Sequence, residues 1–167
     1  RLPSGKRIII ATLRDITERK QIEAQLQHEQ ALLRHLLDSI PDPIFYKDRD
    51  GVYLGCNRAF EALVGSKAQD IIGKTPHNFF HDAAETFVAQ DRQVLEEQRT
   101  LRVERAVTYP DGQQEMLDTL LTPFHTPDGA LLGLLGISRD ITERKAAEEA
   151  LRSAKEAAES ANQTKST

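Results

Sequence analysis

Cys56, the only cysteine among the 167 residues, is the first candidate for chemistry of its own. An accessible thiolate can be oxidised or can form a disulfide with a second chain. A free cysteine is also a small apolar residue, and most free cysteines pack in a core without reacting. Cys56 is therefore interpreted as a packed residue, with a redox switch as the alternative. One cysteine allows no internal disulfide, which is typical of a reducing compartment, so we expect a cytoplasmic domain.

Two histidines, His77 and His81, have the spacing of a metal-binding pair. Residues four apart share one face of a helix, and Asp82 could add a carboxylate. Pro76 and the aromatic pair Phe79-Phe80 instead predict a loop, and the sequence offers no obvious third ligand. We therefore expect both histidines to be polar surface residues and predict no metal site.

Three cations, Lys47, Arg102 and Arg105, lie in strands expected near the core and could hold an anionic ligand if they point inward. The whole chain has a formal net charge of −4 and no basic block, which argues against a nucleic-acid surface. The longest apolar stretch, 130–137, is far shorter than the roughly 20 residues of a membrane span, so no direct membrane contact is expected. Because the chain starts at Arg1, we expect a piece of a longer protein, which could be membrane-anchored elsewhere.

Three Asp-Gly turns, each flanked by strand-like sequence, predict the elements that position these residues. The turns are at Asp50-Gly51, Asp111-Gly112 and Asp128-Gly129. The strands are expected at 44–47, 52–56, 101–109, 113–122 and 130–138. Between the second and third strands, Asn57 as N-cap and Gly65 as terminator predict a helix at 58–64, and further caps and apolar spacing predict helices at 67–72 and 83–97. The order predicts an α+β fold: one five-stranded antiparallel sheet with helices on one face.

Apolar residues of these elements are expected to meet between the sheet and the helices. They can form a fully packed core or line a small ligand cavity, and the pattern is compatible with both. The cavity candidates are Phe45, Leu54, Cys56, Phe60, Leu63, Phe80, Phe87, Leu120 and Ile137.

The sequence Asp-Ile-Thr-Glu-Arg-Lys occurs twice, at 15–20 and at 140–145. Each copy follows an apolar, strand-like run and precedes a charged, helix-forming run, so we interpret both copies as junctions between a strand and a helix. On this interpretation residues 1–16, with a strand at 8–13, are the end of a preceding domain. The junction candidates are Asp15, Thr17, Asp140, Ile141, Thr142 and Arg144, of which Asp140 or Thr142 can cap a helix.

The two helix-forming runs, 17–40 and 143–167, repeat small or apolar residues at steps of three and four. A shift of 125 residues superposes the two patterns, so both helices begin in the same phase. Heptads of this kind predict a homodimer through coiled coils, whereas the alternative is a helix packed on its own domain. The predicted dimer seam contains Ile22, Leu26, Leu33, Leu36, Ala147, Leu151, Ala154 and Ala158.

Five segments carry a family resemblance. They are Ile-Pro-Asp-Pro-Ile-Phe-Tyr-Lys-Asp at 40–48, Gly-Val-Tyr-Leu-Gly-Cys-Asn-Arg-Ala-Phe at 51–60, Ile-Ile-Gly-Lys-Thr at 71–75, Asp-Gly at 111–112 and Gly-Ile-Ser-Arg-Asp-Ile-Thr-Glu-Arg at 136–144. Together they resemble the PAS domains of bacterial sensor histidine kinases over about residues 38–145. The resemblance implies a five-stranded sheet whose helices enclose a small cavity. It also implies dimers whose flanking helices pass a signal to a kinase module of the same chain.

The resemblance divides the chain into a linker helix at 17–40, a PAS domain at 41–142 and a signalling helix at 143–167. Within the last segment, residues 155–167 are similar to the approach to a kinase dimerisation region, but the chain has no histidine-box or nucleotide-binding sequence. The fragment itself is therefore expected to be non-catalytic, with no catalytic residues.

The cofactor is not identified by the resemblance. Flavin-based light sensors of the superfamily carry a reactive cysteine in the region equivalent to 66–73, which has none here. Haem sensors take an axial histidine from the helix equivalent to 83–98, which has none either. Flavin is thus not favoured and haem is not supported, and the domain could have no cofactor.

The sequence therefore predicts a cytoplasmic sensory or relay domain of a sensor histidine kinase, with a small molecule as a candidate ligand. The alternatives are a ligand-free structural dimerisation spacer and a redox switch through Cys56.

Overall fold

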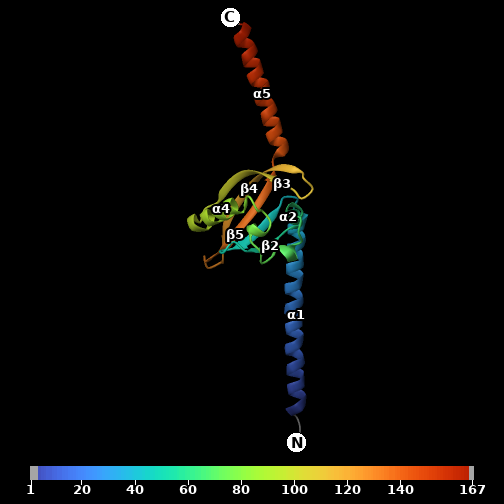
Figure 1. The fold of residues 1–167 in the computed structure, drawn as a ribbon. Coiled ribbons are helices and arrows are strands. Elements are labelled where there is room, and N and C mark those ends of the chain that lie inside the picture. Colours follow the sequence, from blue (N-terminus) through green and yellow to red (C-terminus); the bar gives the residue numbers. More distant parts are fainter. Residues whose placement is uncertain (1–3, 166–167) are drawn as a thin grey trace. The chain divides into compact units, whose positions relative to one another are not determined.

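The sheet of the protein has five antiparallel strands in the order β2-β1-β5-β4-β3 (Figure 1). The computed structural model describes residues 4–165, with side chains of the first helix described from Asp15 onward. The strands are β1 (Ile44–Asp48), β2 (Tyr53–Cys56), β3 (Leu101–Thr108), β4 (Gln114–His125) and β5 (Leu131–Asp140). The predicted α+β fold with one antiparallel sheet is confirmed.

The three predicted Asp-Gly turns lie between consecutive strands. Gly51, Gly112 and Gly129 have φ angles of 79°, 87° and 91°, where a side chain would strain the backbone. In the first turn, the Asp48 carboxylate accepts a hydrogen bond from the Val52 N–H, with 3.0 Å between N and Oδ1. The glycines and aspartates of these turns thus set the hairpin connections predicted for them.

Four helical segments connect β2 to β3 and cover one face of the sheet. They are α2 (Arg58–Val64), α3 (Ala68–Ile71), the 3-10 turn η1 (Pro76–Asn78) and α4 (Ala84–Glu97). The Asn57 side chain caps α2, and Gly65, with φ of 75°, ends it. These two boundaries agree with the cap residues predicted from sequence.

Aromatic rings of β1, β2 and α2 form the centre of the core. The Phe45 and Phe60 ring centroids are 4.8 Å apart, and the Tyr53 centroid lies 5.8 and 5.5 Å from them. Leu117 and Leu121 of β4 are buried against the same cluster. We call the sheet face that carries these side chains the inner face.

Three predicted cavity residues lie on the opposite, outer face of the sheet. Leu54 is 43% exposed and Leu120 is 41% exposed, and half-buried Ile137 is paired with Leu120. Side chains alternate between the two faces along a strand, so Leu120 points away from the core while its neighbour Leu121 points into it. The prediction for these three residues is wrong, because an apolar residue type does not specify which face it occupies.

The N-terminal helix α1 (Ser4–Ser39) belongs to a separate unit, residues 1–39, and the second unit comprises residues 40–167. The predicted strand at 8–13 is therefore wrong, since these residues are helical. A helix satisfies its backbone hydrogen bonds within its own segment, whereas a strand needs a partner strand. The assignment of residues 1–16 to a preceding domain stays a prediction. Pro41 explains the end of α1, because the residue before a proline disfavours helical geometry.

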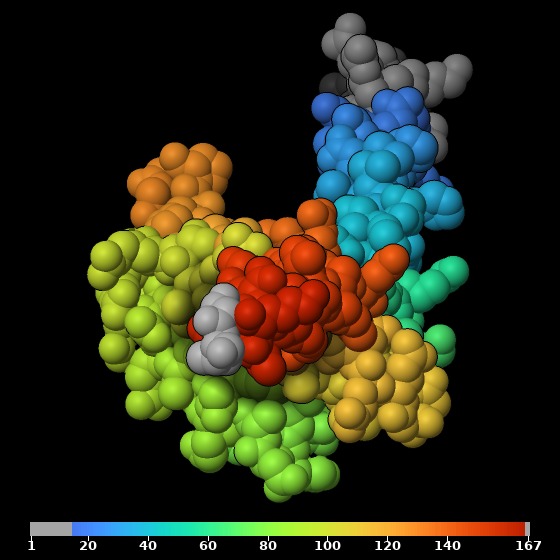
Figure 2. Space-filling view, turned by 90° about the horizontal axis from the view of Figure 1, so that it is seen from above, coloured from blue at the N-terminus to red at the C-terminus, as the bar shows by residue number. Residues whose placement is uncertain are grey.

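The C-terminal helix α5 (Thr142–Lys165) begins directly after β5 and has no buried residue (red in Figures 1 and 2). Its only substantial packing is near its first turn, against β4. Neither α5 nor any other helix of residues 4–165 has both the length and the apolar character of a membrane span.

Asn57 joins β1, α2 and the segment that enters β1. Its Oδ1 accepts hydrogen bonds from the N–H groups of Ile44 and Phe60, at 2.8 and 3.1 Å. Its Nδ2 donates to the carbonyl oxygens of Ile40 and Asp42, at 3.2 and 2.9 Å. The side chain is fully buried, so no solvent can replace these four bonds.

Replacing Asn57 by alanine should lower the free energy of unfolding by about 3 kcal/mol, because the buried N–H groups of Ile44 and Phe60 lose their partner and the α2 cap is lost. Asn78→Ala is the matched control, since Asn78 makes its cap bonds at an exposed site, and it should cost about 1 kcal/mol or less. Urea unfolding curves measure both. Equal losses for the two variants would contradict the role assigned to Asn57.

Candidate functional site: a core cavity and a sheet-to-helix junction

A small cavity of about 40 Å³ lies between the inner face of the sheet and the helices. Its walls combine aromatic and aliphatic side chains with five polar or charged ones. The lining residues are Phe45, Lys47, Tyr53, Phe60, Leu63, Phe80, Phe87, Asp91, Arg105, Val107, Leu117, Thr119, Leu121 and Ser138. This space lies where the sequence placed its cavity candidates, and binding of a ligand in it stays a prediction.

Five of the nine predicted cavity candidates line this space: Phe45, Phe60, Leu63, Phe80 and Phe87. The three outer-face residues described above do not. Cys56 is 2% exposed and packs in the core, outside the cavity lining. Its thiol lacks, in this conformation, the accessibility that a redox switch requires, so that role stays an untested prediction.

Lys47 of β1 and Asp91 of α4 form a buried ion pair in the cavity wall. Nζ and Oδ2 are 2.6 Å apart, and the two side chains are only 2% and 6% exposed. The ammonium also lies 5.0 Å from the Phe45 ring centroid and 4.7 Å from that of Tyr53, within cation–π range. Burial lowers the pKa of Lys47 and raises the pKa of Asp91, because lost hydration outweighs their mutual attraction.

Arg105 of β3 is the second cation of the cavity. Its guanidinium lies 4.3 Å from the Phe87 ring centroid, and Nη2 donates to Gln90 Oε1 at 2.8 Å. Its Nε is buried and has no hydrogen-bond partner among the described residues. Burial lowers the pKa of Arg105, and Asp91 opposes that effect. Of the three cations nominated from sequence, Lys47 and Arg105 thus line the cavity.

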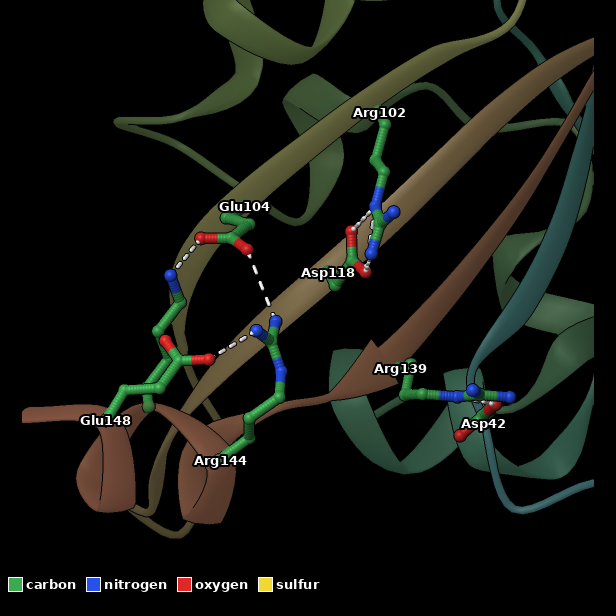
Figure 3. Close-up of polar contacts among 8 residues, drawn as sticks. Asp42, Arg102, Glu104, Asp118, Arg139, Arg144 and Glu148 are labelled. Carbon is green, nitrogen blue, oxygen red and sulfur yellow. Dashed lines mark hydrogen bonds and ion pairs between the residues drawn. The ribbon is translucent and has the colours of Figure 1, made fainter. Parts of the chain in front are cut away.

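The third nominated cation, Arg102, lies on the outer face and pairs with Asp118 across β3 and β4 (Figure 3). Its Nε donates to both carboxylate oxygens, at 2.8 and 3.0 Å. Arg102 and Arg105 are three residues apart on one strand, so they point to opposite faces. Arg102 therefore belongs to the surface of the sheet rather than to the cavity.

Sequence reasoning missed four polar or aromatic residues of the cavity: Tyr53, Asp91, Thr119 and Ser138. The Thr119 and Ser138 hydroxyl oxygens are 2.9 Å apart on neighbouring strands and are buried. A hydroxyl inside an otherwise apolar strand is a signal that could have pointed to this pair. Asp91 had no such signal, because the surrounding α4 sequence is rich in charged residues.

The junction between β5 and α5 is held by hydrogen bonds to β4. Asp140 Oδ1 accepts from the N–H and the hydroxyl of Thr142, at 2.8 and 2.6 Å. The Thr142 hydroxyl oxygen in turn accepts from the Met116 N–H at 2.8 Å, and the Ile141 N–H donates to the Met116 carbonyl at 2.8 Å. Asp140, Ile141 and Thr142 therefore tie the first turn of α5 to one position of β4.

Ion pairs hold the next turn of α5 to β3 (Figure 3). Glu104 of β3 accepts from Lys145 Nζ at 2.5 Å and from Arg144 Nη2 at 3.4 Å. Arg144 also pairs with Glu148 at 2.8 Å. Hydrogen bonds and charges from Lys145, then Arg144, lower the pKa of Glu104. The partners of Arg144 are thus on β3 and one turn further along α5.

The first copy of the repeated sequence has a different setting. Asp15 and Thr17 lie within α1, exposed, so the residues do not form a strand-to-helix junction here. The interpretation of two equivalent junctions is therefore wrong for the first copy. The second copy, at 140–145, forms a junction because it follows β5, a strand paired within the sheet. The first copy does not, because no described strand precedes Asp15.

The predicted dimer seam is exposed in the single chain. Ile22, Leu26, Leu33 and Leu36 of α1 are each more than half exposed. On α5, Leu151 is 72% exposed, and the seam alanines Ala147, Ala154 and Ala158 are exposed as well. The alternative in which α5 packs along its own domain is thus not observed.

The two histidines considered as metal ligands lie in the η1–α4 region. The His77 Nε2 lies 2.9 Å from Glu85 Oε1 at an exposed site. Within the described part of the chain, histidines, cysteines and carboxylates form no group of three arranged to hold a metal ion.

This architecture agrees with comparisons to known proteins. A family model described as PAS fold matches residues 37–146. The chain belongs to the PAS family. The PAS domain is 34% identical over 126 residues to the aerobic respiration control sensor protein ArcB of Escherichia coli, covering 75% of this chain and 16% of ArcB. The whole chain is 30% identical over 170 aligned positions to the virulence sensor protein BvgS of Bordetella pertussis, covering 95% of this chain and 13% of BvgS.

A third relative of the PAS domain is a diguanylate cyclase of Vibrio cholerae, 34% identical over 130 residues, with 75% of this chain and 40% of the relative covered. Among solved structures, the PAS domain from Bordetella pertussis BvgS matches with a TM-score of 0.56 and 27% identity, over 78% of this chain and 98% of that one. The Vibrio cholera VqmA–ligand–DNA complex matches with a TM-score of 0.62 and 28% identity, over 65% of this chain and 50% of that one. The chain spans less than half of the length of these curated relatives.

Replacing Lys47 by methionine should lower the free energy of unfolding by about 3–5 kcal/mol, because the Asp91 carboxylate is left buried without its cation. The double variant Lys47→Met/Asp91→Leu removes both charges and should recover most of that loss. Guanidinium chloride unfolding measures both variants. If the double variant is as unstable as the single one, lost packing rather than an unpaired charge is the cause.

Proposed function

We propose that the chain is a cytoplasmic PAS sensory domain that passes a conformational signal from its core cavity to an output module through α5, within a homodimer. The output module is proposed to be a histidine kinase of the same longer protein. The domain itself acts by changing the relative stability of two arrangements of its flanking helices, without catalysis.

The observation that carries this proposal is the adjacency of cavity and junction on β4. Leu117 and Thr119 line the cavity, and Met116, the preceding residue, holds both Ile141 and Thr142 at the start of α5. A displacement of the cavity wall at Leu117 therefore acts on a backbone unit that is bonded directly to the outgoing helix.

A second connection runs along β3. Arg105 lines the cavity, and the preceding residue, Glu104, pairs with Arg144 and Lys145 on α5. Neighbouring residues of a strand point to opposite faces, so one short piece of backbone carries a cavity residue inside and a junction residue outside. Two strands thus couple the same cavity to the same helix.

The proposed dimer rests on the heptad pattern and on the exposure of its apolar residues. Isolated helices with exposed leucines at such spacing gain stability when a second helix buries them. The alanine-rich seam of α5 offers less apolar area than the leucine seam of α1, so α1 should supply most of the association energy.

The proposed kinase output follows the sensor proteins among the relatives. ArcB and BvgS are both named sensor proteins. The diguanylate cyclase among the relatives indicates that a similar domain also occurs in a protein with a different output activity. The proposal therefore concerns the relay first and the identity of the output module second.

Replacing Asp140 by alanine should leave the domain folded but change the output. The variant loses the two bonds that fix Thr142, and a shift of about 1 kcal/mol between helix arrangements changes their ratio about fivefold. The measurement is autophosphorylation of the full chain fused in helical register to the dimerisation and catalytic modules of a histidine kinase. Asp128→Ala, at the exposed turn between β4 and β5, is the control and should have no effect. If Asp140→Ala leaves autophosphorylation unchanged while circular dichroism shows a folded domain, the relay proposal is wrong.

The chain is expected to sediment at about twice its 18.7 kDa monomer mass. The double variant Leu26→Glu/Leu33→Glu places charges in the proposed seam and should sediment as a monomer. Gln27→Glu/Ala31→Glu adds the same charge on the other side of the helix and should remain dimeric. Sedimentation equilibrium measures all three. A monomeric wild-type chain, or a control that dissociates equally, would contradict the proposed seam.

A further inference from the structure

The charged residues of the core cavity do not balance. Among the described lining residues, Lys47 and Arg105 are cations and Asp91 is the single carboxylate, so two positive charges face one negative charge. Transfer of a proton from Lys47 to Asp91 would not change this sum. Lys47 and Asp91 are buried and Arg105 is half-buried, with its Nε atom buried, and a net charge in such a desolvated space favours a counterion. The cavity is thus one negative charge short of neutrality.

The hydrogen bonds of the cavity also leave one donor without an acceptor. Lys47 already donates to Asp91, and the Thr119 and Ser138 hydroxyls are bonded to one another. Arg105 Nε is the buried donor without a partner in the described structure. A bound acceptor would therefore satisfy Arg105 without displacing any of these bonds.

The size and the walls of the cavity restrict what that acceptor can be. A volume of about 40 Å³ holds about three water molecules, which is comparable to an anion of about four to six non-hydrogen atoms. The remaining walls include the rings of Phe45, Phe60, Phe80 and Phe87, which favour an apolar group. A dianion such as phosphate fits less well. It carries two negative charges where one is missing, and it has no apolar group to contact the aromatic wall.

We propose that the cavity binds a short-chain organic monocarboxylate, with the carboxylate at Arg105 and Lys47 and the alkyl part against the aromatic wall. This inference rests on the proposed sensory function, since it names the ligand class of the same cavity. Binding of this anion would also trigger the proposed relay. An anion that draws the Arg105 side chain into the cavity acts on β3 next to Glu104, and Glu104 holds α5.

The route into the cavity passes the Lys47–Asp91 pair. A surface groove of about 610 Å³ is lined by Arg49, Arg92 and Asp91, among others. Asp91 lines both the groove and the cavity, so its side chain lies at their boundary. The groove has two arginines, Arg49 and Arg92, and three carboxylates, Asp50, Asp91 and Glu96, so its charge does not by itself attract an anion. Parting Asp91 from Lys47 would open the way into the cavity.

The test uses propionate as the anion and propionamide as its neutral counterpart of nearly equal shape. Titrations of the unmodified, isotopically labelled chain are followed by amide chemical shifts in NMR, with sodium chloride added to keep the ionic strength constant. Propionate should give saturable shifts at cavity residues, and propionamide should bind at least about tenfold more weakly, as expected for loss of a charged hydrogen bond. Nitrate, a planar monoanion without an alkyl part, should also bind more weakly than propionate.

Arg105→Gln should weaken propionate binding at least about tenfold. Arg102→Gln is the matched control, because it removes the same charge from the same strand on the outer face, and its affinity should stay within about twofold of the wild type. Circular dichroism verifies that each variant is folded. The comparison of propionate with propionamide needs no variant, so it decides the proposal even if Arg105→Gln does not fold.

The proposal is overturned if propionate gives no saturable shift, if propionamide binds as tightly, or if Arg102→Gln weakens binding as much as Arg105→Gln. These results concern binding alone and would leave the relay and the dimer standing. Conversely, an Asp140→Ala variant without effect, or a monomeric chain, would not affect the anion site.

Discussion

The alternation of side chains along β3 and β4 is the constraint on which the rest of the structure depends. It places Arg105, Leu117 and Thr119 in the core cavity and leaves the residues next to them, Glu104 and Met116, to hold the outgoing helix. In the proposed relay, a displacement at an inner residue therefore acts on the backbone one residue away from the outer contact, so no long pathway between the cavity and α5 is required.

Charge inside the core is the second organising feature. A buried lysine and aspartate and a half-buried arginine are costly compared with apolar residues of similar size, so stability alone does not account for them. Aromatic rings partly offset the cost through cation–π contacts with Lys47 and Arg105. A core with one unbalanced positive charge is suited to sensing. An anionic ligand would neutralise that charge and would stabilise the conformation that binds it.

The two flanking helices differ in what their sequence can do. The exposed leucine seam of α1 offers more apolar surface for association than the alanine-rich seam of α5. In the proposed dimer, α1 would hold two copies together, while the weaker contact through α5 would let that helix respond to small changes at its junction.

The sequence by itself determined the fold class, the hairpin turns, the cap residues Asn57 and Gly65, and five aromatic or aliphatic residues of the cavity, because these depend on local conformation and on residue type. Only the tertiary structure decided which face each strand residue occupies, so it removed Leu54, Leu120 and Ile137 from the cavity and brought Asp91 to Lys47 from a helix 44 residues away. The repeated hexapeptide shows the same limit. Both copies are identical, yet only the copy that follows a paired strand forms a junction, since a strand exists only where a partner satisfies its backbone.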